Sequence, residues 1–258
     1  METQYKKSLS NLPLGSFRYY DTIGSTNDEA LAWVPQGAPD FSLIVANEQT
    51  SGRGRMDRKW FTPPRSALAM SLIFRPTQAE STHPTRTTGL LALSLADSIL
   101  KLGLVPQIKW PNDVLLAARK VAGILVEATW TGNKLDALVL GMGVNVLEAS
   151  IPPSDPLLFP ATSIETELGH PIERAEFLRD FLINVLRWRP KLGTDEFLNA
   201  WNENLAFRGQ QVQVEERSGE KVTGELLGLD SDGGLRLRNK HSKSVTVHFG
   251  EVHLRPLT

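Results

Sequence analysis

Residues 108–128, with the sequence IKWPNDVLLAARKVAGILVEA, decide the fold. Pro-Asn-Asp interrupts the apolar residues and favours a tight turn, so the segment predicts two short strands followed by a return strand. Lys109 ends the first strand between the apolar residues Ile108 and Trp110. A lysine held there could neutralise negative charge that develops on a carboxylate or phosphate, although a lysine snorkelling from a strand edge explains the same pattern.

Further strands and helices are expected on both sides of this segment. Apolar runs bounded by Gly, Pro or Asn predict strands at residues 43–46, 68–74, 107–110, 121–127 and 135–146. Helical spacing of apolar residues predicts a short helix beginning near Ser25 and longer helices at residues 87–102, 173–189 and 194–204. Residues 150–160, SIPPSDPLLFP, are too rich in proline for a regular element and predict a loop. We therefore expect an α+β fold in which helices flank a mixed β-sheet.

The C-terminal part of the chain has a different pattern. From Arg208 onward, apolar and polar residues alternate with a period of two, and Ser-Gly, Asp-Ser-Asp-Gly-Gly and Lys-His-Ser interrupt them. This pattern is typical of short antiparallel strands joined by turns, as in a small β-barrel. The chain has 258 residues, and we predict a larger domain at residues 1–206 and a small β-barrel domain at residues 207–258.

Composition excludes several classes of function. The formal net charge is −1 and the pI is about 6.5, so the protein lacks the overall basic field typical of nucleic-acid binders. The chain contains no cysteine, which excludes disulfides, thiolate nucleophiles and Cys-ligated zinc. The N-terminus lacks the apolar core of a signal peptide, and no run approaches the roughly 18 apolar residues of a membrane span. We expect a cytoplasmic protein that binds neither nucleic acid nor membranes.

Residues 48–60, EQTSGRGRMDRKW, are the strongest candidate for a binding site. Glycines allow backbone N–H groups to turn toward a phosphate, and the guanidinium groups of Arg53, Arg55 and Arg58 can bind phosphate or carboxylate oxygens bidentately. Trp60 offers a flat face to a purine. A solvated basic loop is the alternative interpretation. The Walker A motif is absent, so the sequence does not favour P-loop phosphate binding.

Two further motifs allow both a structural and a functional interpretation. In DTIGSTNDEA, at residues 21–30, the polar Ser-Thr-Asn segment can cap a helix or present hydroxyl and amide groups to a ligand. In LVLGMGVNV, at residues 138–146, Gly141 and Gly143 interrupt an apolar strand before Asn145. Glycines in a strand often mark the close approach of a ligand or another backbone, but a simple β-bulge is equally compatible with them.

In their order and content, these motifs resemble those of the biotin protein ligases. The matching blocks are GSTND at 24–28, EQTSGRGR at 48–55, RKW at 58–60, KWPND at 109–113, KVAGIL at 120–125 and GMGVNV at 141–146. The resemblance covers residues 17–147 strongly, and the tail from about Gly209, including LLGLDSDGGLRL, less specifically. It implies a catalytic fold like that of class II aminoacyl-tRNA synthetases, followed by an SH3-like β-barrel. It also implies an enzyme that forms biotinyl-5'-AMP from biotin and ATP, with Mg²⁺, and transfers biotin to a lysine of a biotin carboxyl carrier protein.

The resemblance implies roles for individual residues. Those implied for biotin are Ser25, Thr26, Asn27, Gln49, Arg53, Gly54, Arg55 and Lys109. Those implied for ATP and the adenylate are Gly52, Arg58, Trp60, Lys120, Gly123 and Asn145. Lys109, Arg55 and Arg58 are the expected catalytic residues, and Asp113 is expected to help place magnesium. The resemblance also allows a homodimer formed through edge strands of the sheet. Asp57 departs from the pattern, because the family loop usually carries glycine there.

Three other functions are disfavoured by the sequence. A lipoate or octanoate ligase or transferase would have a related fold, but the arginine loop and the KWPND block favour the biotin branch. A biotin-sensing transcriptional repressor needs a DNA-binding domain, and only about sixteen residues precede the first motif. A non-catalytic scaffold acting through its terminal barrel is disfavoured because Lys109 and the loop arginines are present.

Overall fold

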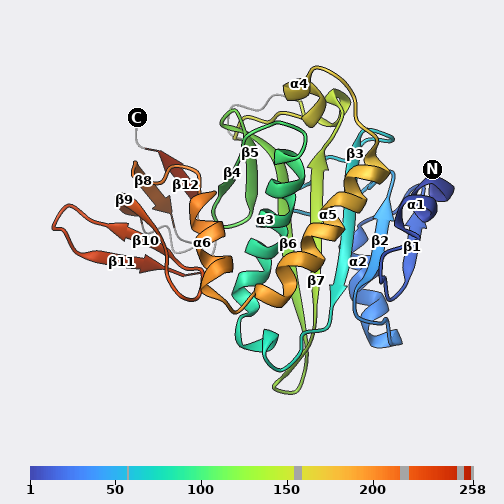
Figure 1. The fold of residues 1–258 in the computed structure, drawn as a ribbon, viewed down its shortest axis with the longest axis horizontal. Helices are drawn as coiled ribbons and strands as arrows, with labels where there is room; N and C mark the ends of the chain where they lie inside the picture. Colours follow the sequence, from blue (N-terminus) through green and yellow to red (C-terminus); the bar gives the residue numbers. More distant parts are fainter. Residues whose placement is uncertain (57, 154–158, 216–220, 249–252, 257–258) are drawn as a thin grey trace.

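The fold comprises two β-sheets with helices around the larger one (Figure 1). The computed structural model describes residues 1–56, 58–153, 159–215, 221–248 and 253–256. Its central sheet has seven strands in the order β1-β2-β3-β7-β6-β5-β4. The second sheet has five strands in the order β11-β10-β9-β8-β12. The predicted α+β class with a mixed main sheet is confirmed.

The central sheet is mixed because its first two strands run parallel and its other strand pairs are antiparallel. Its strands are β1 (Phe17–Tyr20), β2 (Ser42–Ala46), β3 (Ala67–Phe74), β4 (Pro106–Lys109), β5 (Asp113–Leu116), β6 (Arg119–Thr131) and β7 (Lys134–Asn145). Every residue of β2 and β3 is buried, which matches their nearly continuous apolar sequences. As predicted, residues 108–128 contain two short strands, β4 and β5, and the longer return strand β6.

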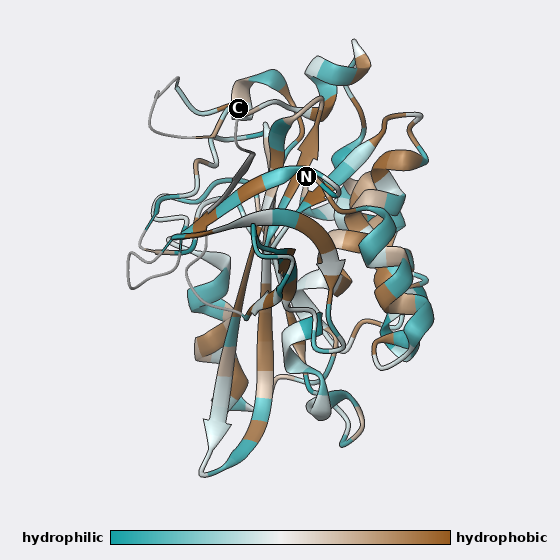
Figure 2. Ribbon diagram, turned by 90° about the vertical axis from the view of Figure 1, so that its left-hand side faces the viewer, coloured by the Kyte–Doolittle hydropathy of each residue, from teal (hydrophilic) through white to brown (hydrophobic). Residues whose placement is uncertain are grey.

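Helices cover the two faces of this sheet unequally. The helices are α1 (Glu2–Leu9), α2 (Thr26–Trp33), α3 (Thr87–Leu100), α4 (Ile164–Leu168), α5 (Arg174–Trp188) and α6 (Asp195–Glu203). Helices α3 and α5 pack against each other over one face (Figure 1). Helix α2 packs on the opposite face against β2, β3 and β7, with Ala30 and Trp33 in its own small core. Figure 2 shows most helices on one side of the sheet.

The C-terminal sheet has the predicted antiparallel topology. Its strands are β8 (Gln211–Glu215), β9 (Lys221–Leu229), β10 (Leu235–Arg238), β11 (Ser244–Val247) and β12 (His253–Pro256). Residues Val212 and Val214 of β8 and Leu235 and Leu237 of β10 are buried, whereas Arg236 between them is exposed. This alternation is the period of two seen in the sequence. The division into domains at residues 206 and 207 stays a prediction.

Two N-terminal elements were not predicted, and one predicted loop is only partly described. Helix α1 has only two buried residues, Tyr5 and Leu9, so its sequence carries little periodic signal. Helix α1 packs on α5, where the carboxylate of Glu176 accepts a hydrogen bond from the hydroxyl of Ser8 at 2.5 Å. Strand β1 was also missed. Of the loop predicted at 150–160, residues 154–158 lie outside the described residues. Within the described ranges, no helix is both long and apolar enough to cross a membrane.

Candidate active site

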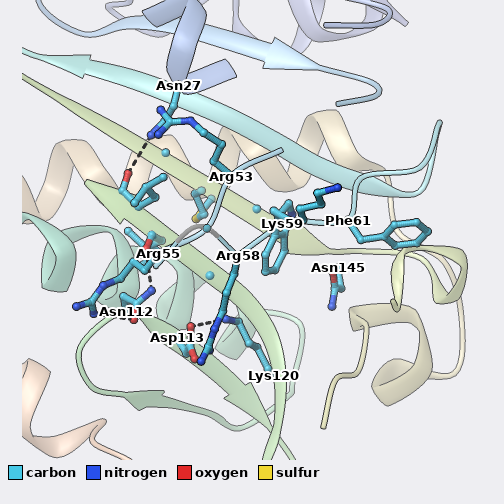
Figure 3. Close-up of a pocket in the computed structure, with 18 of the residues that line it drawn as sticks. Asn27, Arg53, Arg55, Arg58, Lys59, Phe61, Asn112, Asp113, Lys120 and Asn145 are labelled. Carbon is cyan, nitrogen blue, oxygen red and sulfur yellow. Dashed lines mark hydrogen bonds and ion pairs between the residues drawn. The ribbon is translucent and has the colours of Figure 1, made fainter. Parts of the chain in front are cut away.

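One pocket brings together most of the motifs that the sequence singles out (Figure 3). Its walls are the start of α2, the loop between β2 and β3, the turn between β4 and β5, and the facing stretches of β6 and β7. Of the predicted site residues, those that line the pocket are Ser25, Thr26, Asn27, Gln49, Arg53, Gly54, Arg55, Arg58, Trp60, Lys109, Asp113, Lys120, Gly123 and Asn145. Gly52 is the exception.

The start of α2 is held by a side chain distant in sequence. Ser25 occupies the N-cap position with extended backbone angles, but its side chain makes no capping hydrogen bond. Instead, Oε1 of Gln49 accepts from the backbone N–H of Thr26 at 2.8 Å and from its hydroxyl at 3.1 Å. Nε2 of Gln49 donates to Thr62 at 3.2 Å. Gln49 thereby satisfies an N–H group that has no partner within the helix.

Asn27 is buried and uses both ends of its amide. Its Oδ1 accepts from the hydroxyl of Ser71 at 2.5 Å, and its Nδ2 donates to Glu127 at 2.8 Å and to the carbonyl of Leu125 at 3.3 Å. Oγ of Ser71 also lies 2.8 Å from Oγ1 of Thr26. These bonds fix the orientation of the amide, as a recognition group in a ligand pocket requires.

Glu127 also binds the arginine loop. Its carboxylate pairs bidentately with Arg53 at 3.0 and 2.7 Å, and Asp28 contacts the same guanidinium at 2.8 Å. The hydrogen bonds to Glu127 raise the pKa of Arg53, although burial opposes this effect. The sequence predicted that Arg53 would face a carboxylate or phosphate of the ligand. Here it lies beside Asn27 and pairs with two carboxylates of the protein (Figure 3).

The glycines of β7 make room for side chains from other elements. A Cβ atom on Gly141 would lie 2.1 Å from Oδ1 of Asn27, and one on Gly143 would lie 2.1 Å from Nε1 of Trp60. Trp60 also packs on Gly123, where an added Cβ would lie 3.1 Å from the indole ring. The strand glycines therefore make room for two side chains of the protein itself, which is neither the ligand or backbone approach nor the simple bulge that the sequence suggested.

The arginine loop is a short hairpin whose backbone bonds to itself. The N–H of Gly54 donates to the carbonyl of Arg58 at 2.7 Å, and the N–H of Trp60 donates to the carbonyl of Gly52 at 2.8 Å. A Cβ on Gly52 would lie 2.5 Å from the carbonyl oxygen of Trp60, so this glycine permits the pairing of the loop's two arms. Gly52 thus supports the loop without lining the pocket. Asp57 lies outside the described residues.

Two lysines flank the carboxylate of Asp113. Asp113 and Lys120 lie at the end of the pocket opposite Asn27 (Figure 3). Nζ of Lys120 lies 2.6 Å from one oxygen of Asp113, and Nζ of Lys109 lies 3.7 Å from the other. Burial would raise the pKa of Asp113, but the ammonium groups of Lys120 and Lys109 outweigh it and lower that pKa. Asp113 is therefore ionised at neutral pH. The Lys109 ammonium also lies 4.2 Å from the centre of the Phe159 ring.

The pocket lining is strongly cationic. Its charged residues are Arg53, Arg55, Arg58, Lys59, Lys109 and Lys120, against the single acid Asp113. Such a concentration of positive charge favours an anionic ligand. The described residues include no cluster of three or more His, Cys, Asp or Glu that could hold a metal ion. The role of Asp113 in placing magnesium stays a prediction. Its carboxylate is already paired with two lysines.

Several residues at the site were not predicted. Four side chains hold the predicted residues in place, namely Ser71, Thr62, Glu127 and Asn112. Asn112 accepts a hydrogen bond from Arg55 at 3.2 Å. Ser71 carries a signal, because it is the one polar residue in the apolar strand ALAMSLIF. Asn112 lies within the quoted KWPND block. Phe159 is next to residues 154–158 in a segment without a regular pattern, and nothing in the sequence distinguished it.

Comparison with known proteins matches both parts of the chain. The model of the biotin/lipoate A/B protein ligase family matches residues 20–145, and that of the biotin protein ligase C-terminal domain matches residues 207–255. A biotin–[acetyl-CoA-carboxylase] ligase of Paracoccus denitrificans is 35% identical over 237 residues, which cover 88% of this chain and 97% of that protein. One from Mycobacterium tuberculosis is 32% identical over 271 residues, which cover 97% and 96%. Among solved structures, a biotin protein ligase from Aquifex aeolicus in complex with biotin and ATP aligns with a TM-score of 0.79 at 25% identity, covering 94% of this chain and 99% of that one.

Proposed function

Because the chain belongs to the biotin protein ligase family, we infer that it is an ATP-dependent biotin–protein ligase. It forms biotinyl-5'-AMP from biotin and ATP, and then transfers biotin to a lysine of a biotin carboxyl carrier protein. ATP and biotin are its substrates. The relatives compared with it carry biotin–[acetyl-CoA-carboxylase] ligase activity.

The observation that carries this function is the charge of the pocket. The first step joins two anions, because the biotin carboxylate must approach the α-phosphate of ATP. Six lysine and arginine side chains line the pocket with one carboxylate. Preorganised cations in a partly desolvated site stabilise the negative charge of such a transition state without reorganising. Holding both substrates in one pocket also removes much of the entropic cost of their encounter.

The reaction needs no nucleophile from the protein. A carboxylate oxygen of biotin forms a bond to the α-phosphorus, the bond from that phosphorus to the bridging oxygen breaks, and pyrophosphate leaves. The amine of the acceptor lysine then attacks the acyl carbon of the adenylate, AMP leaves, and the nitrogen loses a proton as the amide forms. Lys109, Arg55 and Arg58 are proposed to neutralise charge on the reacting carboxylate and phosphate.

The two ends of the pocket suit different parts of the substrates. Ser25, Thr26, Asn27 and Gln49 form a polar end, in which Ser71 contacts Thr26 and Asn27 and Thr62 holds Gln49. A bicyclic ring with one polar edge, as in biotin, suits a few convergent polar groups of this kind. Trp60 lies on the glycines of β7 and β6 and offers its ring to adenine. The other nucleotide residues proposed are Lys120, Gly123 and Asn145.

Magnesium is proposed to bind together with ATP. One carboxylate paired with two lysines is a poor site for a metal held by the protein alone. Mg²⁺ usually binds through one or two carboxylates together with substrate phosphates, so it would arrive with ATP, where it would offset phosphate charge. A carboxyl carrier domain is the proposed acceptor. The absence of cysteine is compatible with the cytoplasmic location predicted, and the homodimer also stays a prediction.

The test is biotin-dependent exchange of labelled pyrophosphate into ATP, with lipoate and octanoate as competing acids. This exchange reports the first half-reaction alone and needs no acceptor protein. We expect exchange with biotin and none with the other two acids. Exchange with lipoate instead would assign the enzyme to the lipoate branch. Exchange with none of the three acids would contradict the proposed activity.

A further inference from the structure

The turn at residues 230–234 joins β9 to β10 and is rigidly built. Oδ1 of Asp230 accepts from the backbone N–H groups of Asp232 at 2.9 Å and Gly234 at 2.7 Å. The N–H of Asp230 in turn donates to the carbonyl of Gly234 at 2.9 Å. Gly233 has a φ of 81°, in the left-handed region that favours glycine. In the sequence, this DSDGG segment interrupts two predicted strands and belongs to the less specific LLGLDSDGGLRL block of the resemblance.

Three successive carbonyl groups of this turn accept hydrogen bonds from side chains around the central sheet. The bonds are Arg86 Nε to Ser231 O at 3.0 Å, Thr85 Oγ1 to Asp232 O at 2.8 Å, and Trp110 Nε1 to Gly233 O at 2.9 Å. A second nitrogen of Arg86 also donates to the carbonyl of Ser231. The three donors are distant from the turn in sequence, so the turn joins the C-terminal sheet to the larger part of the fold.

Burial makes these contacts costly to lose. Arg86 is 4% exposed and Trp110 is 1% exposed. Arg86 also donates to the carbonyl of Leu192 at 2.8 Å, which fixes its guanidinium from the other side. A buried donor that loses its acceptor is strongly disfavoured, so the turn and the Trp110 side chain must keep their relative positions.

Trp110 directly follows Lys109, the last residue of β4. The ammonium of Lys109 lies within 3.7 Å of Asp113 and 4.2 Å from the Phe159 ring, so its position in the pocket is defined. Because the two residues share a peptide bond, a displacement of the Trp110 ring and backbone would displace Lys109. On its outer edge β4 is also fixed, because the N–H of Ile108 donates to the carbonyl of Asn204 at 2.7 Å.

We propose that residues 230–234 form a positioning turn for biotin activation: by holding Trp110, the turn fixes the Lys109 ammonium where the biotin carboxylate binds. The proposal rests on the proposed function and deepens it. Asp230 and Trp110 are positioning residues, whereas Lys109 touches the substrate. The C-terminal sheet thus takes part in the first half-reaction through the shape of one hairpin turn.

The test is a double-mutant cycle between Asp230 and Lys109, read as the dissociation constant of labelled biotin in equilibrium dialysis. Asp230→Ala removes both side-chain bonds that hold the turn, whereas the matched control Asp230→Asn keeps an Oδ1 acceptor. With Lys109 present, we expect Asp230→Ala to weaken biotin binding about five- to twentyfold and Asp230→Asn less than about twofold. In a Lys109→Ala background, Asp230→Ala should add less than about twofold, because its effect passes through Lys109.

Two outcomes would overturn the proposal. An equal loss of affinity in both backgrounds would show that the turn supports the fold and not Lys109. Unchanged affinity in both would show that the turn has no influence on the site. Failure of the unmodified enzyme to bind biotin would contradict the proposed function instead. If Asp230→Ala does not fold, as judged by near-UV circular dichroism, Trp110→Phe replaces it under the same criteria, since it deletes the bond from Nε1 to the carbonyl of Gly233 and leaves the turn intact.

Discussion

Adding one methyl group at either of two positions on β7 should disturb one end of the pocket and leave the other end unchanged. Gly141→Ala places a Cβ 2.1 Å from Oδ1 and 2.8 Å from Nδ2 of Asn27, whereas Gly143→Ala places one 2.1 Å from Nε1 of Trp60. The two positions are two residues apart on one strand and carry the same chemical change. Each variant is therefore the matched control for the other.

The size of the effect follows from what must move. Carbon seldom approaches another heavy atom closer than about 3.4 Å, so each neighbouring group has to shift by about 1 Å or more. Asn27 would then lose two or three buried hydrogen bonds, each with a net value of about 0.5–1.5 kcal/mol. A loss of roughly 1–3 kcal/mol of this in biotin binding corresponds to about a fivefold to 150-fold rise in the KM for biotin. Overpacking should also lower stability by about 1–3 kcal/mol in both variants.

Pyrophosphate exchange measured over a range of biotin and ATP concentrations is the assay. We expect Gly141→Ala to raise the KM for biotin and leave that for ATP within about twofold, and Gly143→Ala to do the reverse. Thermal melting identifies the stability loss common to both. The assignment of biotin to the Asn27 end is refuted if folded Gly141→Ala keeps its KM for biotin, or if both variants raise both KM values equally.

Three more predictions concern charged groups of the site. Lys109→Ala should slow adenylate formation about 10²–10³-fold in single-turnover measurements while the enzyme still folds, and turnover like that of the unmodified enzyme would exclude its catalytic role. Lys120 and Lys109 lower the pKa of Asp113 despite burial. The stability that this carboxylate contributes to the fold is therefore fully present above pH 3.8, the ordinary pKa, and is lost as the pH falls through the lowered pKa. The difference in urea midpoint between the unmodified enzyme and Asp113→Asn should therefore shrink below about pH 4, and a constant difference would contradict the assignment. Glu127→Gln should weaken the ion pair with Arg53, which Asp28 still contacts. Because a half-exposed ion pair contributes about 0.2–1 kcal/mol, tryptic cleavage within residues 52–60 should become up to about fivefold faster. An unchanged cleavage rate would show that this pair does not hold the loop.

Most strands and the content of the pocket were predictable because their signals are local. The apolar strand β3 and the Pro-Asn-Asp turn before β5 need no knowledge of the rest of the chain. Charged motifs close to one another in sequence likewise identified the arginine loop. By contrast, helix α1 depends on contacts with α5, far along the chain, and its own sequence has too few apolar residues to predict it.

The partners of the predicted site residues could not be read from the sequence. Glu127 pairs with Arg53, 74 residues away, and Asn27 is set by Ser71, 44 residues away. Such pairs depend on the register of β3, β6 and β7, which apolar patterning does not fix to the residue. The sequence therefore did not reveal the two carboxylates that pair with Arg53, and the contact of Arg53 with the ligand stays a prediction.

The hairpin turn between β9 and β10 contacts the central sheet through its main chain, and this has an evolutionary consequence. Carbonyl oxygens exist whatever the side chain, so Ser231 and Asp232 can be exchanged for other residues while their acceptors persist. The donors have no such freedom, because Arg86 and Trp110 must supply specific N–H groups. Substitutions at this junction should therefore be unequal: Ser231 and Asp232 should vary, whereas Arg86 and Trp110 should rarely be replaced.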